Sequence, residues 1–268
     1  MRYLIISLVI IFISVMIAVL FAMYSIRMRS ESYEPDWNNM PVYCINLGDS
    51  ITRRKNMIHA YMHFPFKLRI VEAVDTRHDK WILYTNKISD RAFYTMFWTI
   101  RNNIRPRHMD LSPGAVGCFL SHIKTWKLFQ STGESFALIM EDDSSFPAIT
   151  FLRDMTEIIR TWPTSCHVVI LNYIINGYTV THGKYKYLSH DAKSSFFLLN
   201  CYLLSKEGVE QLLALVEDAE FRIDVQIDAF ITQHIHSSDL NVAFWYRNIC
   251  PQDGRDGTTI QTYGALDF

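Results

Sequence analysis

The most apolar stretch of this sequence lies at its N-terminus. Residues 4–23 read LIISLVIIFISVMIAVLFAM, and only Ser7 and Ser14 interrupt the apolar run. At about 1.5 Å per helical residue, a run of this length spans about 30 Å, the hydrocarbon thickness of a bilayer. A cleaved signal peptide has an apolar region of about 7–15 residues and a small-residue cleavage site, whereas this run is longer and ends in FAMYSIRMR. The pattern predicts one transmembrane helix within an N-terminal anchor of residues 1–26.

The apolar periodicity disappears after the anchor and then returns in a different form. Residues 27–40 (RMRSESYEPDWNNM) contain Pro35 and no apolar period, which is typical of a linker. Residues 41–268 show no second linker and no internal repeat, and their length suits a single core. We therefore expect residues 41–268 to form a single domain that is large enough to be a catalytic domain.

Within this domain, short apolar runs alternate with amphipathic segments. Ser112 and Pro113 provide a cap and a first-turn proline for a strong helix that runs to about Phe129. Alternation of strands and helices predicts an α/β fold with a mostly parallel sheet covered on both faces. The predicted strands are VYCINL (42–47), FKLRIVEAV (66–74), FALIM (136–140), HVVIL (167–171) and FFLLNCYLL (196–204), and the other predicted helices are RRKNMIHAYMHF (53–64) and KEGVEQLLALVED (206–218).

Charge and cysteine usage exclude some classes of partner and site. The 26 Lys and Arg nearly balance the 27 Asp and Glu, for a formal net charge of −1, which argues against nucleic acid as a partner. The five cysteines include no C-x-x-C pair and have no His at zinc-finger spacing, so a structural zinc site is not expected. There is no N-x-[ST] acceptor for N-glycosylation.

The strongest chemical feature is a run of three carboxylates, Glu141, Asp142 and Asp143, directly after the apolar strand 136–140. The carboxyl ends of strands in an open α/β sheet border the usual ligand crevice. Carboxylate oxygens there suit a hard divalent cation, which would neutralise a diphosphate leaving group. The alternative is a solvated acidic turn. The position after a buried strand favours the metal site.

Five segments, in their order along the chain, resemble glycosyltransferase family 25, the group that includes bacterial lipooligosaccharide galactosyltransferases and collagen galactosyltransferases. The resemblance covers almost the whole chain after the linker. Its segments are PVYCINLGDSITRR (41–54), EAVDTR (72–77), LSPGAVGCFLSHIKTW (111–126), FALIMEDD (136–143) and CYLLSKEGVEQLL (201–213).

This resemblance implies a GT-A-like fold and transfer of a sugar, usually galactose from UDP-galactose, with inversion at the anomeric carbon. It also implies Mn²⁺ or another divalent cation at the three carboxylates. The acceptor would be a glycan or a protein. Together with the predicted anchor, it implies a single-pass membrane protein of the endomembrane system (ER or Golgi) or the cell envelope, with the catalytic domain C-terminal to the anchor.

Matching the family motifs residue by residue assigns candidate donor-binding groups. Asn46, Arg53 and Arg54 belong to the opening motif, and Arg side chains can bind phosphate through two parallel hydrogen bonds. Asp75 matches the family's A-V-D and would accept hydrogen bonds from ribose or uracil, and His122 matches its S-H pair. The alternatives are solvation of a helix by the arginines, an Asx turn at Asp75 and a core role for His122.

The catalytic base is expected in FRIDVQIDAF, where Asp224 and Asp228 are four residues apart and share a face if the segment is helical. Asp224 fits the family's late acidic position and is the expected base or acceptor-site residue. The alternative is that both residues solvate a helix amino terminus.

One departure from the family pattern keeps a non-catalytic interpretation open. The family usually has T-P-G-E-I-G where this chain has SPGAVG, so Ala115 replaces an acidic residue. That Glu stands at capping-box spacing, and its loss costs either a helix-cap bond or a sugar contact. A degenerate relative that binds glycans or acts as a scaffold is therefore the alternative function. A metal-dependent phosphohydrolase is disfavoured because no suitable Asp nucleophile follows the first strand.

Overall fold

The computed structural model describes residues 14–17, 40–62, 64–145, 147–253 and 264–265. The predicted anchor and linker therefore lie almost entirely outside the described residues. Within the described part of the chain, no helix combines the length and apolarity needed to cross a bilayer.

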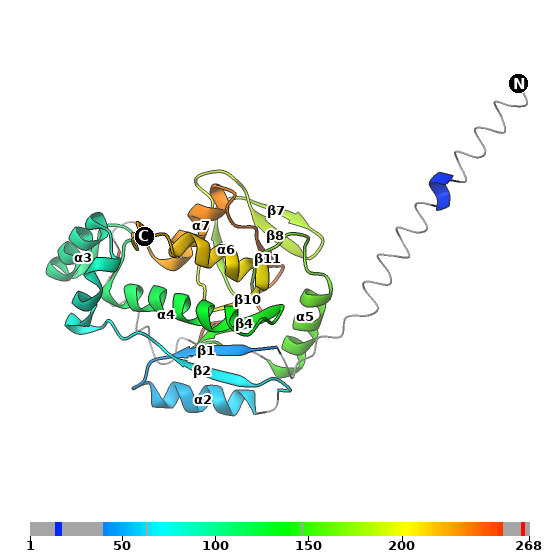
Figure 1. Cartoon of the computed structure of the whole chain (residues 1–268), viewed down its shortest axis with the longest axis horizontal. Helices are drawn as coiled ribbons and strands as arrows, with labels where there is room; N and C mark the ends of the chain where they lie inside the picture. Colours follow the sequence, from blue (N-terminus) through cyan, green and yellow to red (C-terminus); the bar gives the residue numbers. More distant parts are fainter. Residues whose placement is uncertain (1–13, 18–39, 63, 146, 254–263, 266–268) are drawn as a thin grey trace, which may run out of the picture.

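The described domain is a three-layer α/β structure around one eight-stranded sheet (Figure 1). The sheet order is β2-β1-β4-β10-β5-β11-β8-β7. Its strands are β1 (Val42–Asn46), β2 (Leu68–Glu72), β4 (Phe136–Glu141), β5 (Val168–Ile170), β7 (Thr179–His182), β8 (Tyr185–Leu188), β10 (Cys201–Ser205) and β11 (Val242–Trp245). Two small sheets pair β3 (Ile104–Arg105) with β12 (Gly264–Ala265), and β6 (Ile174–Asn176) with β9 (Ser195–Phe197).

The α/β prediction is confirmed, but the sheet is mixed in direction. Strand β1 pairs in parallel with β2 and β4, and β5 pairs in parallel with β11. Strand β10 is antiparallel to both β4 and β5, and the β7–β8 hairpin continues antiparallel from β11. The expectation of a mostly parallel sheet is therefore met around β1 and not across the rest of the sheet.

Helices cover both faces of the sheet, each over its own apolar core. On one face, α4 (Pro113–Gln130), α6 (Lys206–Val216) and α7 (Ile227–His236) pack against inward residues such as Ile139 and Tyr202. On the other face, α2 (Ile51–Tyr61) and α5 (Ala148–Arg160) pack against alternate residues such as Met140 and Leu203. The alternation follows from the two-residue period of a strand. The 3-10 segment η1 (His78–Lys87) and helix α3 (Asp90–Asn102) complete the described elements.

Helix α4 is the element that the sequence predicted most closely. Ser112 caps it by accepting a hydrogen bond from the backbone N–H of Ala115 at 3.2 Å, and Pro113 occupies the first turn. Gly117 faces the segment after β2 so closely that a Cβ there would lie 2.4 Å from the Val74 carbonyl oxygen. The glycine therefore allows α4 to approach the end of β2, where the candidate site lies.

One predicted strand is wrong. The run 196–204 is predicted as one central strand, but it divides into β9 and β10, which belong to different sheets. The break lies at Leu198, which has a φ of 76°. Leucine rarely adopts this left-handed conformation, so the sequence carries no local signal for the break.

Candidate functional site

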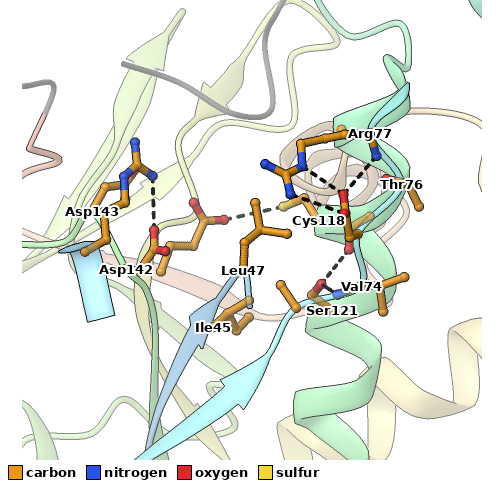
Figure 2. Close-up of a pocket in the computed structure, with 15 residues that line it drawn as sticks. Ile45, Leu47, Val74, Thr76, Arg77, Cys118, Ser121, Asp142 and Asp143 are labelled. Atoms are coloured by element: carbon orange, nitrogen blue, oxygen red, sulfur yellow. Dashed lines mark hydrogen bonds and ion pairs between the residues drawn. The ribbon is translucent and has the colours of Figure 1, made fainter. Parts of the chain in front are cut away.

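A pocket of about 560 Å³, open to solvent, lies where β1, β2 and β4 end beside the N-terminal half of α4. This is the carboxyl end of three neighbouring parallel strands, the usual ligand position in an open α/β sheet. In Figure 2, Asp142 and Asp143 face the pocket from one side and Arg77 and Thr76 lie on the other. The lining residues are Ile45, Leu47, Arg53, Ala73, Val74, Asp75, Thr76, Arg77, Gly114, Gly117, Cys118, Ser121, Glu141, Asp142 and Asp143.

Hydrogen bonds join the opening motif to the acidic cluster. Asn46, the last residue of β1, donates from Nδ2 to Asp142 Oδ2 at 2.7 Å and accepts from Arg54 Nε at 2.7 Å. Arg53 from α2 contacts Asp142 Oδ1 through Nη1 at 3.1 Å. Burial raises the pKa of Asp142, while the bonds from Asn46 and Arg53 oppose that rise. The predicted residues Asn46, Arg53, Arg54 and Asp142 therefore form one network beside the pocket.

Asp143 is the least compensated carboxylate of the cluster. Its Oδ2 accepts a 2.7 Å hydrogen bond from Gln252, and Arg53 Nη1 lies 4.0 Å from the same oxygen. Its Oδ1 is buried and has no hydrogen-bond partner among the described residues. Burial and the nearby charge of Glu141 raise the pKa of Asp143 to about 7. A buried anionic oxygen without a partner is costly, and a bound cation would remove that cost.

Asp75 lies in the pocket lining, as expected, but its carboxylate is already paired. Arg77 donates to Asp75 Oδ1 at 2.8 Å, and Lys80 donates to Oδ2 at 2.5 Å. These bonds, that from Arg77 above all, hold the pKa of Asp75 well below its usual range. Arg77 also binds Asp49 at 2.7 Å, so this side of the pocket combines fixed charges of both signs.

His122 is fully buried and does not line the pocket, so it does not meet the donor directly in this structure. Its Nε2 lies 3.3 Å from Glu141 Oε1, and its Nδ1 lies 2.8 Å from the Tyr202 hydroxyl. Cys118, one helical turn before His122, also contacts Glu141, with Sγ 3.4 Å from Oε1. Two side chains of α4 therefore orient Glu141, whereas Asp142 is bound by Asn46 and Arg53, and Asp143 by Gln252.

The structure separates Asp224 from the pocket. Asp224 binds Ser89 and Arg91 at the start of α3 and is absent from the pocket lining. Burial alone would raise its pKa, but the hydrogen bonds from Arg91 and Ser89 outweigh that effect and lower it. Helix α7 begins at Ile227, so Asp224 and Asp228 do not share a helical face as the sequence suggested.

Asp228 is also absent from the pocket lining, but the charge of Glu141, which lines the pocket, acts on its carboxylate. It accepts backbone hydrogen bonds from Leu198 at 3.4 Å and Ala229 at 2.8 Å. Burial raises the pKa of Asp228 to about 6, and the charge of Glu141 contributes to the rise. Like Asp143, Asp228 is thus an acid whose pKa is raised toward neutral pH.

The raised pKa of Asp228 predicts a pH dependence of stability. The pKa of Asp228 is higher in the folded than in the unfolded protein. Its contribution to the free energy of unfolding is therefore full below about pH 4 and is lost as the pH rises through about 6. A pKa difference of one unit corresponds to about 1.4 kcal/mol. Because Asp228→Asn removes the titrating carboxylate, the free energy of unfolding of this variant should fall with rising pH by less than that of the unaltered protein, the difference being at most about 3 kcal/mol. Urea unfolding of both proteins at about pH 4.5 and about pH 8 measures it. Equal pH dependence in the two proteins would contradict the prediction.

Several site residues were not assigned from the sequence. Arg77, Cys118 and Ser121 line the pocket, and all three stand inside motifs that the sequence had singled out. Gln252 binds Asp143 from the C-terminal tail, and the backbone N–H of Asp253 donates to the Asp143 carbonyl at 2.6 Å. Residues 254–263 lie outside the described residues.

The sequence of the chain is similar to those of known proteins. The model of "Glycosyltransferase family 25 (LPS biosynthesis protein)" matches residues 39–231, which include every pocket-lining residue. The chain is also similar to a human protein named "Inactive glycosyltransferase 25 family member 3", with 29% identity over 111 residues. That match covers 39% of this chain and 16% of the human protein, so the chain spans a small part of that relative.

The range of the family match includes all five motif segments of the sequence and every pocket-lining residue. The family match covers well over half of the chain and includes the strands β1, β2 and β4, whose ends build the pocket. On these grounds the chain belongs to glycosyltransferase family 25.

Proposed function

We propose that this protein is a membrane-anchored, metal-dependent glycosyltransferase with a GT-A-like fold. It would transfer galactose from UDP-galactose, with inversion, to a glycan or a hydroxylated protein. The observation that carries the proposal is the pocket at the strand ends, where Asp143 presents a buried carboxylate oxygen without a partner among the described residues. Such an oxygen beside a basic side chain suits a metal bound to a diphosphate.

The carboxylates of the acidic cluster are not equally available as ligands for Mn²⁺. Asp143 has a buried oxygen with no partner among the described residues, whereas both carboxylate oxygens of Asp142 already bind Asn46 and Arg53. Asp143 would therefore be the principal ligand, with Asp142 close enough to join it if Arg53 turns to the donor. The metal, when bound, supplies positive charge that stabilises the departing diphosphate.

The nucleotide side of the pocket would be formed by Arg53, Arg77 and Asp75. Arg53 and Arg77 both line the pocket and can bind phosphate oxygens by charge-assisted hydrogen bonds. Asp75 is held ionised by Arg77 and Lys80, so it remains a hydrogen-bond acceptor for a ribose hydroxyl or uracil. His122 would act indirectly, by orienting Glu141.

The base of an inverting transfer must take a proton from the acceptor hydroxyl. Asp224 was the candidate from the family motif, but Arg91 and Ser89 hold it outside the pocket lining. Asp228 is also absent from the pocket lining, but it is the better candidate, because its raised pKa of about 6 suits proton transfer and the charge of Glu141, which lines the pocket, contributes to that rise. We therefore assign the base to Asp228.

The second candidate function is a degenerate transferase that binds glycans without turnover. The observations in its favour are the printed name of the human relative, which is called inactive, and the missing acid at Ala115. Against the second of these, Ala115 is buried in the core and does not line the pocket, and Ser112 caps α4 without help from an acid. Loss of this Glu therefore leaves the pocket intact.

The full-length chain, purified in detergent from the membrane fraction, allows a direct test. We expect one UDP-sugar of a panel, UDP-galactose first, to be turned over with Mn²⁺, to stop on chelation and to resume when Mn²⁺ is restored. No turnover of any donor by folded protein would favour the degenerate relative. Recovery of the chain in the soluble fraction after a salt wash would contradict the anchor.

A further inference from the structure

One group of three different donor side chains lies partly in the pocket lining and partly behind it, apart from the Asp142–Asp143 pair. Cys118 and His122 are four residues apart on α4 and so project from one face of the helix. Glu141, the last residue of β4, lies opposite them. The sulfur, nitrogen and oxygen atoms that they offer all lie within 4.8 Å of one another.

Two of the three spacings among these atoms match a tetrahedral zinc site, and the third lies within 4.8 Å. Zinc binds sulfur at about 2.3 Å and nitrogen or oxygen at about 2.0–2.2 Å, which places neighbouring donor atoms roughly 3.3–3.6 Å apart. Here Cys118 Sγ lies 3.4 Å from Glu141 Oε1, and His122 Nε2 lies 3.3 Å from the same oxygen. A cation could therefore enter the group with only small side-chain movements.

The surroundings of His122 hold its ring in the orientation that a metal ligand needs. Its Nδ1 lies 2.8 Å from the Tyr202 hydroxyl, which also accepts a 2.8 Å hydrogen bond from Trp126 Nε1. Both aromatic residues are fully buried, so the ring is fixed with Nε2 toward Glu141. Metal-bound histidines are typically held in this way through their second ring nitrogen.

The chemistry of the donor set separates this group from the proposed Mn²⁺ ligands. Thiolate and imidazole donors favour zinc and related ions, whereas manganese and magnesium prefer oxygen. Cys118 and Glu141 both line the pocket, so a cation held by three protein ligands would keep its fourth position toward the pocket. We propose that Cys118, His122 and Glu141 form a binding site for zinc. This goes beyond the proposed transferase function, because zinc would bind whether or not a sugar is transferred.

Cobalt is the spectroscopic probe for this site. The full-length chain, stripped of metal, should bind Co²⁺ with a thiolate-to-cobalt charge-transfer band that saturates at one equivalent per chain at this site and that Zn²⁺ displaces. Cys118→Ser should lose the band and bind Zn²⁺ at least about 100-fold more weakly. Cys166→Ser, at a buried cysteine elsewhere in the fold, should keep both properties. Unchanged Co²⁺ and Zn²⁺ binding by Cys118→Ser would overturn the proposal.

A second measurement needs no variant. All five cysteines lie in the described part of the chain, and Cys118 is half-buried while the other four are buried. Alkylation of the native protein should therefore label Cys118 first, and Zn²⁺ should slow that labelling at least about tenfold while Mg²⁺ does not. Equal labelling with and without Zn²⁺ would also overturn the proposal. Cys118→Ser retains Asp142 and Asp143, so a negative result leaves the transferase test unaffected.

Discussion

An Asp143→Asn variant is expected to lose metal-dependent donor turnover by at least about 100-fold. The substitution keeps the shape of the side chain but removes the negative charge of the one cluster residue with a buried oxygen lacking a partner among the described residues. Removing one preorganised charged group that stabilises a developing charge typically costs about 10²–10³-fold in rate. Initial rates of UDP release at saturating Mn²⁺, for variant and unaltered protein, provide the measurement.

The amide oxygen of the Asp143→Asn side chain can still accept the hydrogen bond that Gln252 donates to Asp143, so the local fold should persist. The matched control is Glu210→Gln, which removes an equivalent charge from an exposed position on α6 and should leave turnover unchanged. Thermal unfolding of both variants shows whether any loss is structural. Full metal-dependent turnover in folded Asp143→Asn would remove Asp143 from the metal site.

The second large effect concerns the buried ion pair between Arg53 and Asp142. Arg53→Met is expected to destabilise the fold by about 3 kcal/mol, because it leaves the Asp142 carboxylate buried with Asn46 as its remaining close partner among the described residues. The Arg53 and Asp142 side chains are each only 9% exposed, so water cannot replace the missing partner well. Urea unfolding near neutral pH gives the free energy of unfolding.

A double-mutant cycle isolates the pair. Adding Asp142→Asn to Arg53→Met removes the uncompensated charge, and we expect it to restore at least half of the lost stability. Simple additivity of the two single effects would show that the pair is not coupled. The same proteins should bind donor more weakly than the unaltered chain, because Arg53 lines the pocket.

The sequence was most informative where local signals agree with the tertiary environment. Ser112, Pro113 and the apolar period after them define α4 almost to the residue, because the cap bond and the first-turn proline act within the helix itself. The strands β1 and β4 were equally clear, since both are largely apolar and both are buried, β1 throughout and β4 in its central residues. The Glu-Asp-Asp run after β4 indicated the pocket from its position alone.

Other features depend on residues distant in the sequence. The break between β9 and β10 lies at Leu198, whose backbone N–H donates a hydrogen bond to Asp228. Because Asp228 is distant in the sequence, no local pattern predicts the break. The sequence favoured Asp224 over Asp228, but Arg91 and Ser89 hold Asp224 outside the pocket lining, whereas Asp228 lies in the first turn of α7 and accepts a hydrogen bond from the Leu198 backbone. Zinc-finger spacing could not group Cys118 with His122 and Glu141, because Glu141 lies at the end of a strand distant in the sequence.

The sequence by itself determined the α/β class, the main elements and the family motifs, because periodicity, caps and residue order are local properties, and the N-terminal anchor stays a prediction. Only the tertiary structure decided the mixed strand directions and the different roles of the three carboxylates. Asp142 pairs with Arg53, Asp143 retains an oxygen without a described partner, and Glu141 turns to Cys118 and His122. Three adjacent acids become chemically distinct because pKa and hydrogen bonding depend on which distant side chains the fold brings to each one.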